Sequence, residues 1–523
     1  MKKRIDKQQN YEYTRSKTVR YFLSQMIVVI ILLLLQFTLV GLFFIAMFIN
    51  SQRSVLYAVA FIVCWLSSAV VAFVVINRKC NTAYKLAWVV PVLLFPGAGA
   101  ALYLLVRGGS VHKIAKKRIL KSRESFSQIA PPPLDAPFPE DHAKARLRSY
   151  LDSIGFPAYD GTSAVYLPTG EAFQEKLLEE LRKAEKFIFI EFFIIHEGEM
   201  WDGVLKILEE KAAQGVIVRV MYDGMGSLKT LPGNYPKVLR KKGIDAKVFG
   251  PFVPLISSTQ NNRDHRKIVV IDGKVAFTGG INQSDEYINL YERFGHWKDS
   301  GICISGKGAE RMTRLFLELW YTNHTPDEKP EEFLPAYAEK APGYIVPYAD
   351  SPLFETEYIK NIYLELINGA KKYIYIITPY LVPGDDLLSA LCRAARGGVD
   401  VRLITPFHGD KRIVHMISRS YYKQLLEAGV RVFEYSPGFI HSKTMVCDDS
   451  VCSVGTCNLD YRSLYLHYEC GVVALDCPVV TEVKEDHLKT EALCHEVAEN
   501  ELKTPRGLKA LVFSVLRFFE PLV

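Results

Sequence analysis

The chain has 523 residues, which is too long for one average domain and supplies enough material for a sizeable core. Its hydrophobic fraction of 49% is high for a chain with 23% charged residues, so the apolar residues must be unevenly distributed. The net charge of +7 favours anionic partners such as lipid headgroups or nucleic acid, while the 10 cysteines form no CxxC pair and argue against a zinc site or a disulfide framework.

The N-terminal part of the chain is apolar in two successive runs, residues 26–49 and 55–76, and neither run contains a charge. Each is long enough to span a bilayer, which requires about 20 residues. A cleavable signal peptide is the alternative for the first run, but that run is too long and the second follows at once. We therefore predict two transmembrane helices.

A third apolar stretch, residues 86–106, is interrupted by Pro91 and by the run 96–99. These interruptions allow a bent helix, a helical hairpin or a re-entrant element. Basic residues precede the first run, follow the second and become dense after the third, and the positive-inside rule assigns all three groups to the cytoplasm. We therefore predict a multi-pass protein of the cell membrane, with a membrane region over residues 1–120 and the remaining chain in the cytoplasm.

The rest of the chain divides into a linker, two similar globular halves and a tail. The proline-rich composition of residues 121–143 disfavours helices and strand pairing and is typical of a linker. Beyond it, helix-like and strand-like segments alternate twice in the same order, which predicts α/β units around largely buried sheets. We assign a first α/β domain to residues 144–335, a second to residues 336–490 and a helical C-terminal tail to residues 491–523.

Each globular half ends with the same spaced set of residues. The first set is His265, Lys267, Asp272, Gly279 and Asn282. The second set, with identical offsets from its histidine, is His441, Lys443, Asp448, Gly455 and Asn458. A single set of this kind is about as often a solvated surface strand as a functional site, but matched positions in both halves of a repeat make chance a poor explanation.

The paired histidines and lysines suit chemistry on a phosphodiester. Residues two apart on a strand project from the same face, so the imidazole and the ammonium of one set can converge on one phosphate. If the two halves face each other, Lys267 and Lys443 can stabilise charge on the phosphoryl oxygens. One neutral histidine can then attack phosphorus and form a covalent phosphoenzyme, while the other, protonated, donates a proton to the leaving oxygen.

Acidic and amide side chains complete the candidate site. Asp272 and Asp448 stand before turns, and we assign them a structural or histidine-orienting role within the catalytic sets rather than acid catalysis. The supporting candidates are Asn282, Asn458, Glu191 and Glu469. The two asparagines can donate hydrogen bonds near the phosphate, and the two glutamates stand where an acid could fix a histidine, although a glutamate in a strand is as often a pairing residue. No ligand-like cluster accompanies them, so we expect neither a metal nor a cofactor.

The two spaced sets, with their trailing GGIN and GTCN, closely resemble the paired motifs of the phospholipase D superfamily. The segments EFFIIHEGEMWDGVL, TPYLVPGDD, SRSYYKQLLEAGVRVFEY and NLDYRSL are similar to bacterial cardiolipin synthases in particular. This resemblance runs from the membrane segment AWVVPVLLFPGAGAALYLL to the C-terminal RFFEPLV and so covers most of the chain. The sequence departs from the family pattern in His467 and Tyr468, which precede Glu469, and in its long first helix.

The resemblance implies a tandem of two phospholipase D-like α/β domains with one active site between them, no metal, and a phosphohistidine intermediate. It makes His265 the nucleophile and His441 the general acid and base. The implied reaction transfers a phosphatidyl group from one phosphatidylglycerol to another, giving cardiolipin and glycerol. The partner is then an anionic phospholipid of the membrane, and no nucleic acid is expected.

Several alternatives remain open at this point. Water as the acceptor would make the protein a phospholipase, and another alcohol would make it a different phosphatidyltransferase. A membrane-tethered nuclease fits the membrane segments less well, and an inactive scaffold predicts at least one degraded motif, whereas both are intact. Residues 301–308 are similar to a phosphate-binding loop, but Gly308 stands where Ser or Thr is required, so we predict a strand and a turn there.

Overall fold

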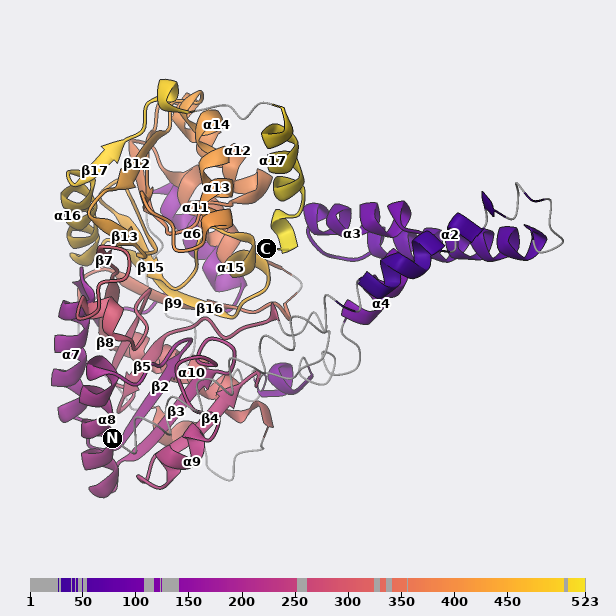
Figure 1. Cartoon of the computed structure of the whole chain (residues 1–523). Helices are drawn as coiled ribbons and strands as arrows, with labels where there is room; N and C mark the ends of the chain where they lie inside the picture. The colour runs from indigo at the N-terminus through magenta and orange to yellow at the C-terminus, as the bar shows by residue number, and fades with distance from the viewer. Residues whose placement is uncertain are drawn as a thin grey trace. The chain divides into compact units, whose positions relative to one another are not determined.

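The computed structural model describes residues 27, 30–38, 40–42, 44–45, 49, 54–107, 117–122, 124, 141–251, 261–323, 330–334, 341–354, 356–502 and 507–522 (Figure 1). The chain forms two compact units. The first, here called the N-terminal unit, contains residues Met1–Ile114, Phe252–Asn261 and Leu511–Val523. The second, here called the globular unit, contains residues Ala115–Pro251 and Asn262–Ala510. Most of the predicted linker, 121–143, falls outside the described residues.

Among the described residues, one helix is long and apolar enough to cross a membrane. This helix, α2 (Ser54–Ile76), coincides with the second predicted span, and its residues Val55–Ile76 have a mean hydropathy of 2.7. The described residues of the first predicted span, 26–49, include a shorter apolar helix over Ile30–Leu42. The other parts of that span are outside the described residues.

The third apolar stretch consists of two short helices, α3 (Thr82–Leu94) and α4 (Ala98–Val106). The chain turns between them at Gly97, whose φ of +85° is disfavoured for other residues. The two helices cross closely, because a Cβ atom at Gly99 would lie 2.4 Å from the carbonyl oxygen of Pro91. The structure thus has the helical hairpin among the three predicted alternatives. At 13 residues and 1.5 Å per residue, α3 is about 20 Å long, less than the bilayer core.

The first half of the globular unit is built on a seven-stranded sheet in the order β1-β8-β6-β5-β2-β3-β4. Its strands are β1 (Thr162–Leu167), β2 (Phe187–Phe192), β3 (Ile217–Asp223), β4 (Asp245–Phe249), β5 (Ile268–Ile271), β6 (Val275–Gly279) and β8 (Gly301–Gly306). Its helices are α7 (Gly170–Arg182), α8 (Glu199–Ala213), α9 (Tyr235–Arg240), η2 (Asp285–Ile288), α10 (Lys307–Trp320), η3 (Tyr321–Asn323) and η4 (Pro330–Phe333). Helix α6 (His142–Ser153) precedes this half in the chain but packs on α11 (Tyr358–Gly369) of the second half.

The second half repeats this order in an eight-stranded sheet, read as β9-β16-β15-β14-β10-β11-β12-β17. Its strands are β9 (Tyr344–Asp350), β10 (Tyr373–Ile377), β11 (Asp400–Pro406), β12 (Arg431–Tyr435), β14 (Thr444–Cys447), β15 (Val451–Gly455), β16 (Glu469–Leu475) and β17 (Cys494–Glu496). Its helices are α11 (Tyr358–Gly369), α12 (Gly384–Arg396), α13 (Arg412–Ser420), α14 (Tyr422–Leu426), α15 (Tyr461–Tyr465) and α16 (Val479–Glu491). A small parallel pair, β7 (His296–Lys298) with β13 (Gly438–Ile440), joins the two halves.

Two details differ from the sequence-based expectations. Strand β17 pairs with β12, so the predicted helical tail, 491–523, contributes an edge strand before its helical part begins. The tail then forms η5 (Glu499–Glu501), α17 (Leu508–Phe518) and η6 (Glu520–Leu522). The segment 301–308 is a strand as predicted, but helix α10 follows it directly instead of a turn.

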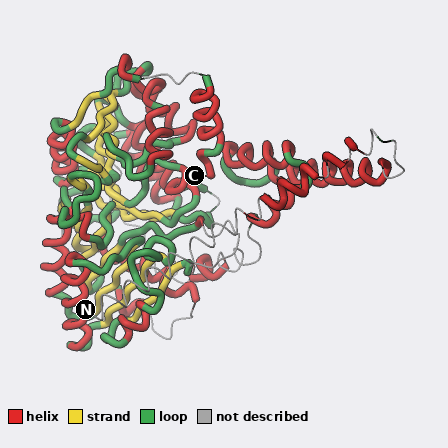
Figure 2. The backbone as a smooth tube through the Cα atoms, in the orientation of Figure 1, coloured by secondary structure: helices red, strands yellow, loops and turns green. Residues whose placement is uncertain are grey.

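The sheets are interior layers with helices outside, as the strands enclosed by helices in Figure 2 show. Every residue of β2 and of β10 is buried, which fits their unbroken runs of β-branched and aromatic residues. Apolar side chains of α7 and α8, among them Leu177 and Val204, pack on β2 in one core cluster. These buried sheets hold the strand ends that carry the two histidine and lysine sets.

Candidate active site

The main chain of each catalytic set is hydrogen-bonded to the opposite half of the globular unit. The amide of His265 donates to the carbonyl of Tyr468 at 2.9 Å, and the amide of His441 donates to the carbonyl of Lys298 at 2.7 Å. The acceptor residue is followed in each case by an acid, Glu469 or Asp299. Each half therefore holds the histidine of the other half by an equivalent main-chain hydrogen bond.

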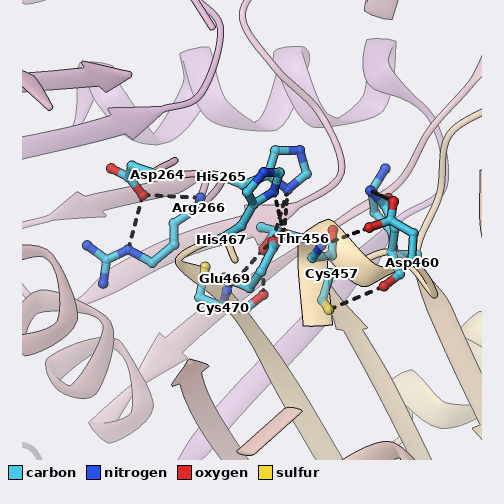
Figure 3. Close-up of polar contacts among 12 residues, drawn as sticks. Asp264, His265, Arg266, Thr456, Cys457, Asp460, His467, Glu469 and Cys470 are labelled. Carbon is cyan, nitrogen blue, oxygen red and sulfur yellow. Dashed lines mark hydrogen bonds and ion pairs between the residues drawn. The ribbon is translucent and has the colours of Figure 1, made fainter. Parts of the chain in front are cut away.

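Each of these acids also binds the histidine side chain of the other half. The Nδ1 atom of His265 lies 2.9 Å from Oε1 of Glu469, a contact drawn in Figure 3, and the Nδ1 atom of His441 lies 2.7 Å from Oδ2 of Asp299. The carboxylate of Glu469 can only accept, so Nδ1 of His265 carries the proton and donates, and its Nε2 keeps the lone pair. Nδ1 of His441 lies 2.9 Å from Nζ of Lys443 in addition to its contact with Asp299, whose pKa burial raises to about 7. The arrangement leaves the Nε2 atoms of both histidines as the nitrogens available for reaction.

The carboxylate of Glu469 is itself fixed from its own half. The hydroxyl of Thr456 donates to Oε2 of Glu469 and accepts from the amide of Cys470 at 3.0 Å (Figure 3). In the first half, Asp299 accepts at 2.8 Å from the amide of Ser300. Both acids are fully buried, so their orientation is set by these bonds rather than by water.

The two lysines are buried beside the histidines. The ammonium of Lys267 donates to the carbonyl of His265 at 2.6 Å, and the ammonium of Lys443 donates to the carbonyl of His441. Burial lowers the pKa of Lys267 to about 8 and the pKa of Lys443 to about 7. Two ammonium groups held in so little water provide strong stabilisation for an anion that enters between them.

Burial also lowers the pKa of both histidines well below the usual range, and the neighbouring charges of Lys267 and Lys443 lower them further. The imidazoles are thus neutral in the free site at neutral pH, which suits the nucleophile. A bound phosphodiester brings a negative charge that raises these pKa values again. A phosphodiester bound here would therefore favour protonation of one of the two histidines.

Asp272 and Asp448 lie at the other end of the strands that follow the histidines. The carboxylate of Asp272 accepts from the amides of Glu185, Lys186 and Phe187, where β2 begins. The carboxylate of Asp448 accepts in the same way from the amides of residues 371–373, where β10 begins. Seven residues from histidine to aspartate correspond to roughly 20 Å of extended chain, so the structure gives these aspartates a structural place and not a histidine-orienting one.

The supporting candidates separate into those at the site and one beside it. Asn282 donates from Nδ2 to the Tyr287 hydroxyl at 2.7 Å, and Asn458 donates to Asp460 at 3.1 Å. Glu469 orients His265, as described above. Glu191 instead pairs with the guanidinium of Arg266, at 2.7 Å from Nε, and contacts neither catalytic histidine among the described interactions.

Sequence reasoning missed several residues that the structure places at the site. One of them is Asp299. A sequence signal for it existed, because Asp299 and Glu469 each stand two residues before a glycine of equivalent strands, β8 and β16. The rings of Tyr287 and Trp297 lie 5.7 Å and 5.6 Å from the His441 ring. No local pattern separated these two aromatics from ordinary core residues.

His467 adds a third imidazole near the nucleophile. Its ring centroid lies 5.4 Å from that of His265, and its Nδ1 lies 3.6 Å from Oε1 of Glu469 (Figure 3). The donor atoms of these three residues lie within 4.8 Å of one another, a set that can hold a metal ion. The positive charges of Lys267 and Lys443 both act on His265, so they oppose a cation at this place.

The chain matches twice the family model described as cardiolipin synthase, phospholipase D-like domain, over residues 177–320 and 363–489. Residues 55–108 match the model described as phospholipase D-nuclease N-terminal. An uncharacterized protein of Streptococcus mutans is 40% identical over 86% of this chain and 98% of its own length. A cardiolipin synthase of Geobacillus thermodenitrificans is 36% identical over 76% of this chain and 81% of its own length.

A solved structure, phosphatidylserine synthase of Haemophilus influenzae, superposes with a TM-score of 0.55, covering 72% of this chain and 97% of its own. Its sequence identity of 16% makes it a likeness of fold alone. The family matches cover both α/β halves and include both histidine and lysine sets. Together with reciprocal histidine and acid pairs between two repeated halves, they establish that this chain is a phosphatidyltransferase belonging to the cardiolipin synthase family of the phospholipase D superfamily.

Proposed function

We propose that the protein transfers a phosphatidyl group from one phosphatidylglycerol to a second, forming cardiolipin and glycerol through a phosphohistidine intermediate. The observation that carries this proposal is the pair of neutral imidazoles, His265 and His441, each fixed at Nδ1 by an acid of the other half. Two ammonium groups beside them, on Lys267 and Lys443, can stabilise the negative charge of a phosphodiester and the further charge that develops on its oxygens during transfer.

The first step displaces glycerol. Nε2 of His265 attacks phosphorus, a nitrogen–phosphorus bond forms, and the bond from phosphorus to the glycerol oxygen breaks. Protonated His441 gives its Nε2 proton to that oxygen, so glycerol leaves as a neutral alcohol. The assignment of His265 as nucleophile rather than His441 rests on the family resemblance, since the two geometries are equivalent.

In the second step, His441 acts as a base instead of an acid. His441, now neutral, takes the proton from a glycerol hydroxyl of the second phosphatidylglycerol, and the oxygen attacks phosphorus. The nitrogen–phosphorus bond breaks, His265 is regenerated, and cardiolipin leaves. One phosphodiester replaces another, so no nucleotide energy source is needed. Membrane anchoring keeps the acceptor lipid at a high effective concentration relative to the site.

The same proposal includes the placement of the chain in the cell membrane. Two spans, 26–49 and 55–76, with the α3–α4 hairpin entering from the cytoplasmic side, put all basic clusters in the cytoplasm. The globular unit then faces the cytoplasmic leaflet, where anionic phospholipid is available to it.

The test uses the purified full chain in liposomes of phosphatidylglycerol. Glycerol and cardiolipin should form in equal amounts, with no loss of rate in EDTA. His265→Ala should lower the rate by roughly 10⁴-fold or more and abolish any trapped phosphoenzyme, because the nucleophile is missing. His495→Ala, which changes an exposed histidine on β17, is the matched control and should retain the wild-type rate.

Three outcomes would reject parts of the proposal. Phosphatidic acid in place of cardiolipin would identify water as the acceptor. Cutting of DNA without lipid conversion would identify a nuclease. Substantial activity in the His265→Ala variant would reject the assigned nucleophile, and loss of activity in EDTA that a divalent ion restores would reject the metal-free mechanism.

A further inference from the structure

Four large apolar side chains on two segments of the globular unit are exposed. They are Leu290, 57% exposed, Tyr291, 60% exposed, Phe407, 38% exposed, and Ile413, 50% exposed. The other exposed large apolar residues described in the globular unit are Leu120, Val165, Ile217, Leu488 and Leu493. Exposed single apolar residues are ordinary, but a group from two loops at one site indicates an interaction surface.

Leu290 and Tyr291 lie on a loop that is closed at its base. The side chain of Asn289 accepts from the Trp297 amide at 2.7 Å and donates to the Trp297 carbonyl at 3.2 Å. Residues 290–293, which follow Asn289, are all exposed, and Arg293 is among them. Because Trp297 also lies beside His441, this loop starts and ends at the catalytic centre.

Phe407 and Ile413 lie on the segment between β11 and the start of α13. Asp410 anchors this segment, since it accepts from the Tyr380 hydroxyl at 2.8 Å. The ammonium of Lys411 lies 4.6 Å from the centre of the Tyr380 ring. Its charge contributes to lowering the pKa of both His265 and His441, so Lys411 is close to the site although it is exposed.

One apolar cluster joins the bases of the two loops. Tyr287, Trp297 and Tyr380 belong to it, and the partly buried Phe294 and Val414 pack against it. Phe294 comes from the first loop and Val414 from helix α13, so the two exposed segments lie on the two sides of one buried base. That base contacts the His441 ring through Tyr287 and Trp297.

We propose that these residues form a rim that inserts into the surface of an anionic bilayer at the mouth of the active site. The rim consists of Leu290, Tyr291, Arg293, Phe407, Lys411, Arg412 and Ile413. Its apolar members fit the boundary between headgroups and acyl chains, and its cations fit anionic phosphate. The acids nearby are Glu292, in the first loop, Glu286, which lies 3.9 Å from Arg293, and Asp410, held by Tyr380.

The rim would let the diacylglycerol part of a substrate remain in the bilayer while its phosphodiester enters between the two lysines. This rests on the proposed lipid substrate but adds a physical surface that the chemistry does not require. A water-soluble phosphodiester would need no such contact. The rim also differs from the membrane-spanning helices, because it belongs to the globular unit.

The test measures quenching of a fluorophore by lipids that carry a doxyl group near the headgroup. The full chain carries Cys80→Ser, because Cys80 is the exposed native thiol, and His265→Ala, so that no turnover occurs. The fluorophore is placed at Tyr291→Cys or Ile413→Cys, and at Leu493→Cys as the matched control, an exposed apolar position in the turn between α16 and β17. The vesicles contain equal parts of phosphatidylglycerol and phosphatidylcholine.

Quenching at positions 291 and 413 should be roughly threefold stronger than at position 493. Replacing both Lys411 and Arg412 by Gln should lower quenching at position 413, and vesicles of phosphatidylcholine alone should give the same reduction. Quenching no stronger than at position 493 would overturn the proposal. Quenching that is equal on both kinds of vesicle would overturn its anionic part. Absent quenching, with Ile413→Cys chains that cross-link to each other, would assign the rim to self-association instead.

These outcomes are separable from failure of the proposed reaction. The measurement uses an inactive variant, so rim contact can be found even if the acceptor proves to be water. If the active chain forms cardiolipin but its rim is not quenched, only the rim inference fails.

Discussion

At the scale of single residues, the site holds two lysine ammonium groups in a place from which water is excluded. Burial dominates the pKa of Lys443 and lowers it to about 7, against the attraction of Asp299, which raises it. Burial lowers the pKa of Lys267 in the same way, and the attraction of Glu469 raises it. The charged ammonium that binds phosphate is therefore a cost to the folded state before substrate arrives.

Removing that charge should stabilise the protein while abolishing its activity. Lys443→Met keeps the length of the side chain. Because the lowered pKa of Lys443 already includes the attraction of Asp299, removing the ammonium should raise the free energy of unfolding below about pH 7, by at most about 5 kcal/mol. The folded pKa of about 7 lies below the ordinary value of 10.5, so the cost of the charge is complete below about pH 7 and disappears as the pH approaches 10.5. Denaturant unfolding at about pH 6 and about pH 10 measures this difference.

Lys489→Met, at a highly exposed position on α16, controls for general effects of the substitution and should show no such pH dependence. Equal or lower stability of Lys443→Met at about pH 6 would mean that Asp299 and the histidine carbonyl offset the burial of the ammonium.

The residues predicted from sequence were those with an exact repeat. Histidine and lysine recur at fixed offsets, because the short segment that carries them leads directly into β5 or β14 and cannot change length without turning the side chains away from the site. Asp299 was missed because the distance from its motif differs between halves: it stands 34 residues after His265, while Glu469 stands 28 after His441. The loop that changes this distance is the one with Leu290 and Tyr291, where insertion costs little.

At the scale of elements, the third motif residue fixes a strand end. Asp272 and Asp448 have φ angles of +52° and +51°, a region that aspartate tolerates better than most residues. Each carboxylate collects three amides at the start of β2 or β10, and those strands lie next to β5 and β14. The motif thus joins a catalytic end and a structural end on one strand.

A matched pair of substitutions separates these two ends. Asp448→Asn should lower the free energy of unfolding by about 1–3 kcal/mol, because charge-assisted bonds to three amides weaken, and should leave kcat near that of wild type. Asp299→Asn should instead lower kcat by roughly 10²- to 10⁴-fold, because Nδ1 of His441 loses the acceptor that fixes its tautomer. Thermal unfolding and steady-state rates below the transition report the two effects.

A large loss of kcat in a folded Asp448→Asn variant would show that this aspartate has a catalytic role. Wild-type activity in Asp299→Asn would show that the contact with His441 is not what orients the imidazole.

Helix α10 shows why one element was not predicted. Gly306 ends β8 and Gly308 lies in the first turn of α10, and no clean helix-forming run follows them in the sequence. The structure uses them for space: a Cβ at Gly308 would lie 3.0 Å from a Thr162 side-chain carbon, and its amide donates to the Thr162 hydroxyl at 2.9 Å. The glycine at position 308 is required by close packing against β1, which is distant in the sequence. Local helix propensity contains no information about such packing.

At the scale of the whole molecule, the α/β repeat followed from the order of elements, while one site shared by both halves was implied by the family resemblance. The strand order β1-β8-β6-β5-β2-β3-β4 did not, because it is set by pairing between segments far apart in the chain. The small β7–β13 pair between the halves was also outside the reach of sequence patterns, since each strand has only three residues. Yet this pair places Lys298 and the following Asp299 against His441.

The orientation of the chain in the membrane gives a prediction with a native reporter. Cys80, between α2 and α3, is exposed and lies beside Arg78 and Lys79, which the positive-inside rule assigns to the cytoplasm. An impermeant maleimide should therefore leave Cys80 unmodified in intact cells and modify it after permeabilisation. Gln52→Cys, in the sequence between the two predicted spans, is the matched control.

Gln52→Cys should react in intact cells, because two spans that start in the cytoplasm put the residues between them outside. This pair of thiols distinguishes the possible arrangements, since a reversed chain exchanges the two results. Modification of Cys80 in intact cells would place the basic loop, and with it the start of the α3–α4 hairpin, on the outer face. If neither thiol reacts until the cells are permeabilised, both ends of α2 lie on the cytoplasmic side, and α2 does not cross the membrane.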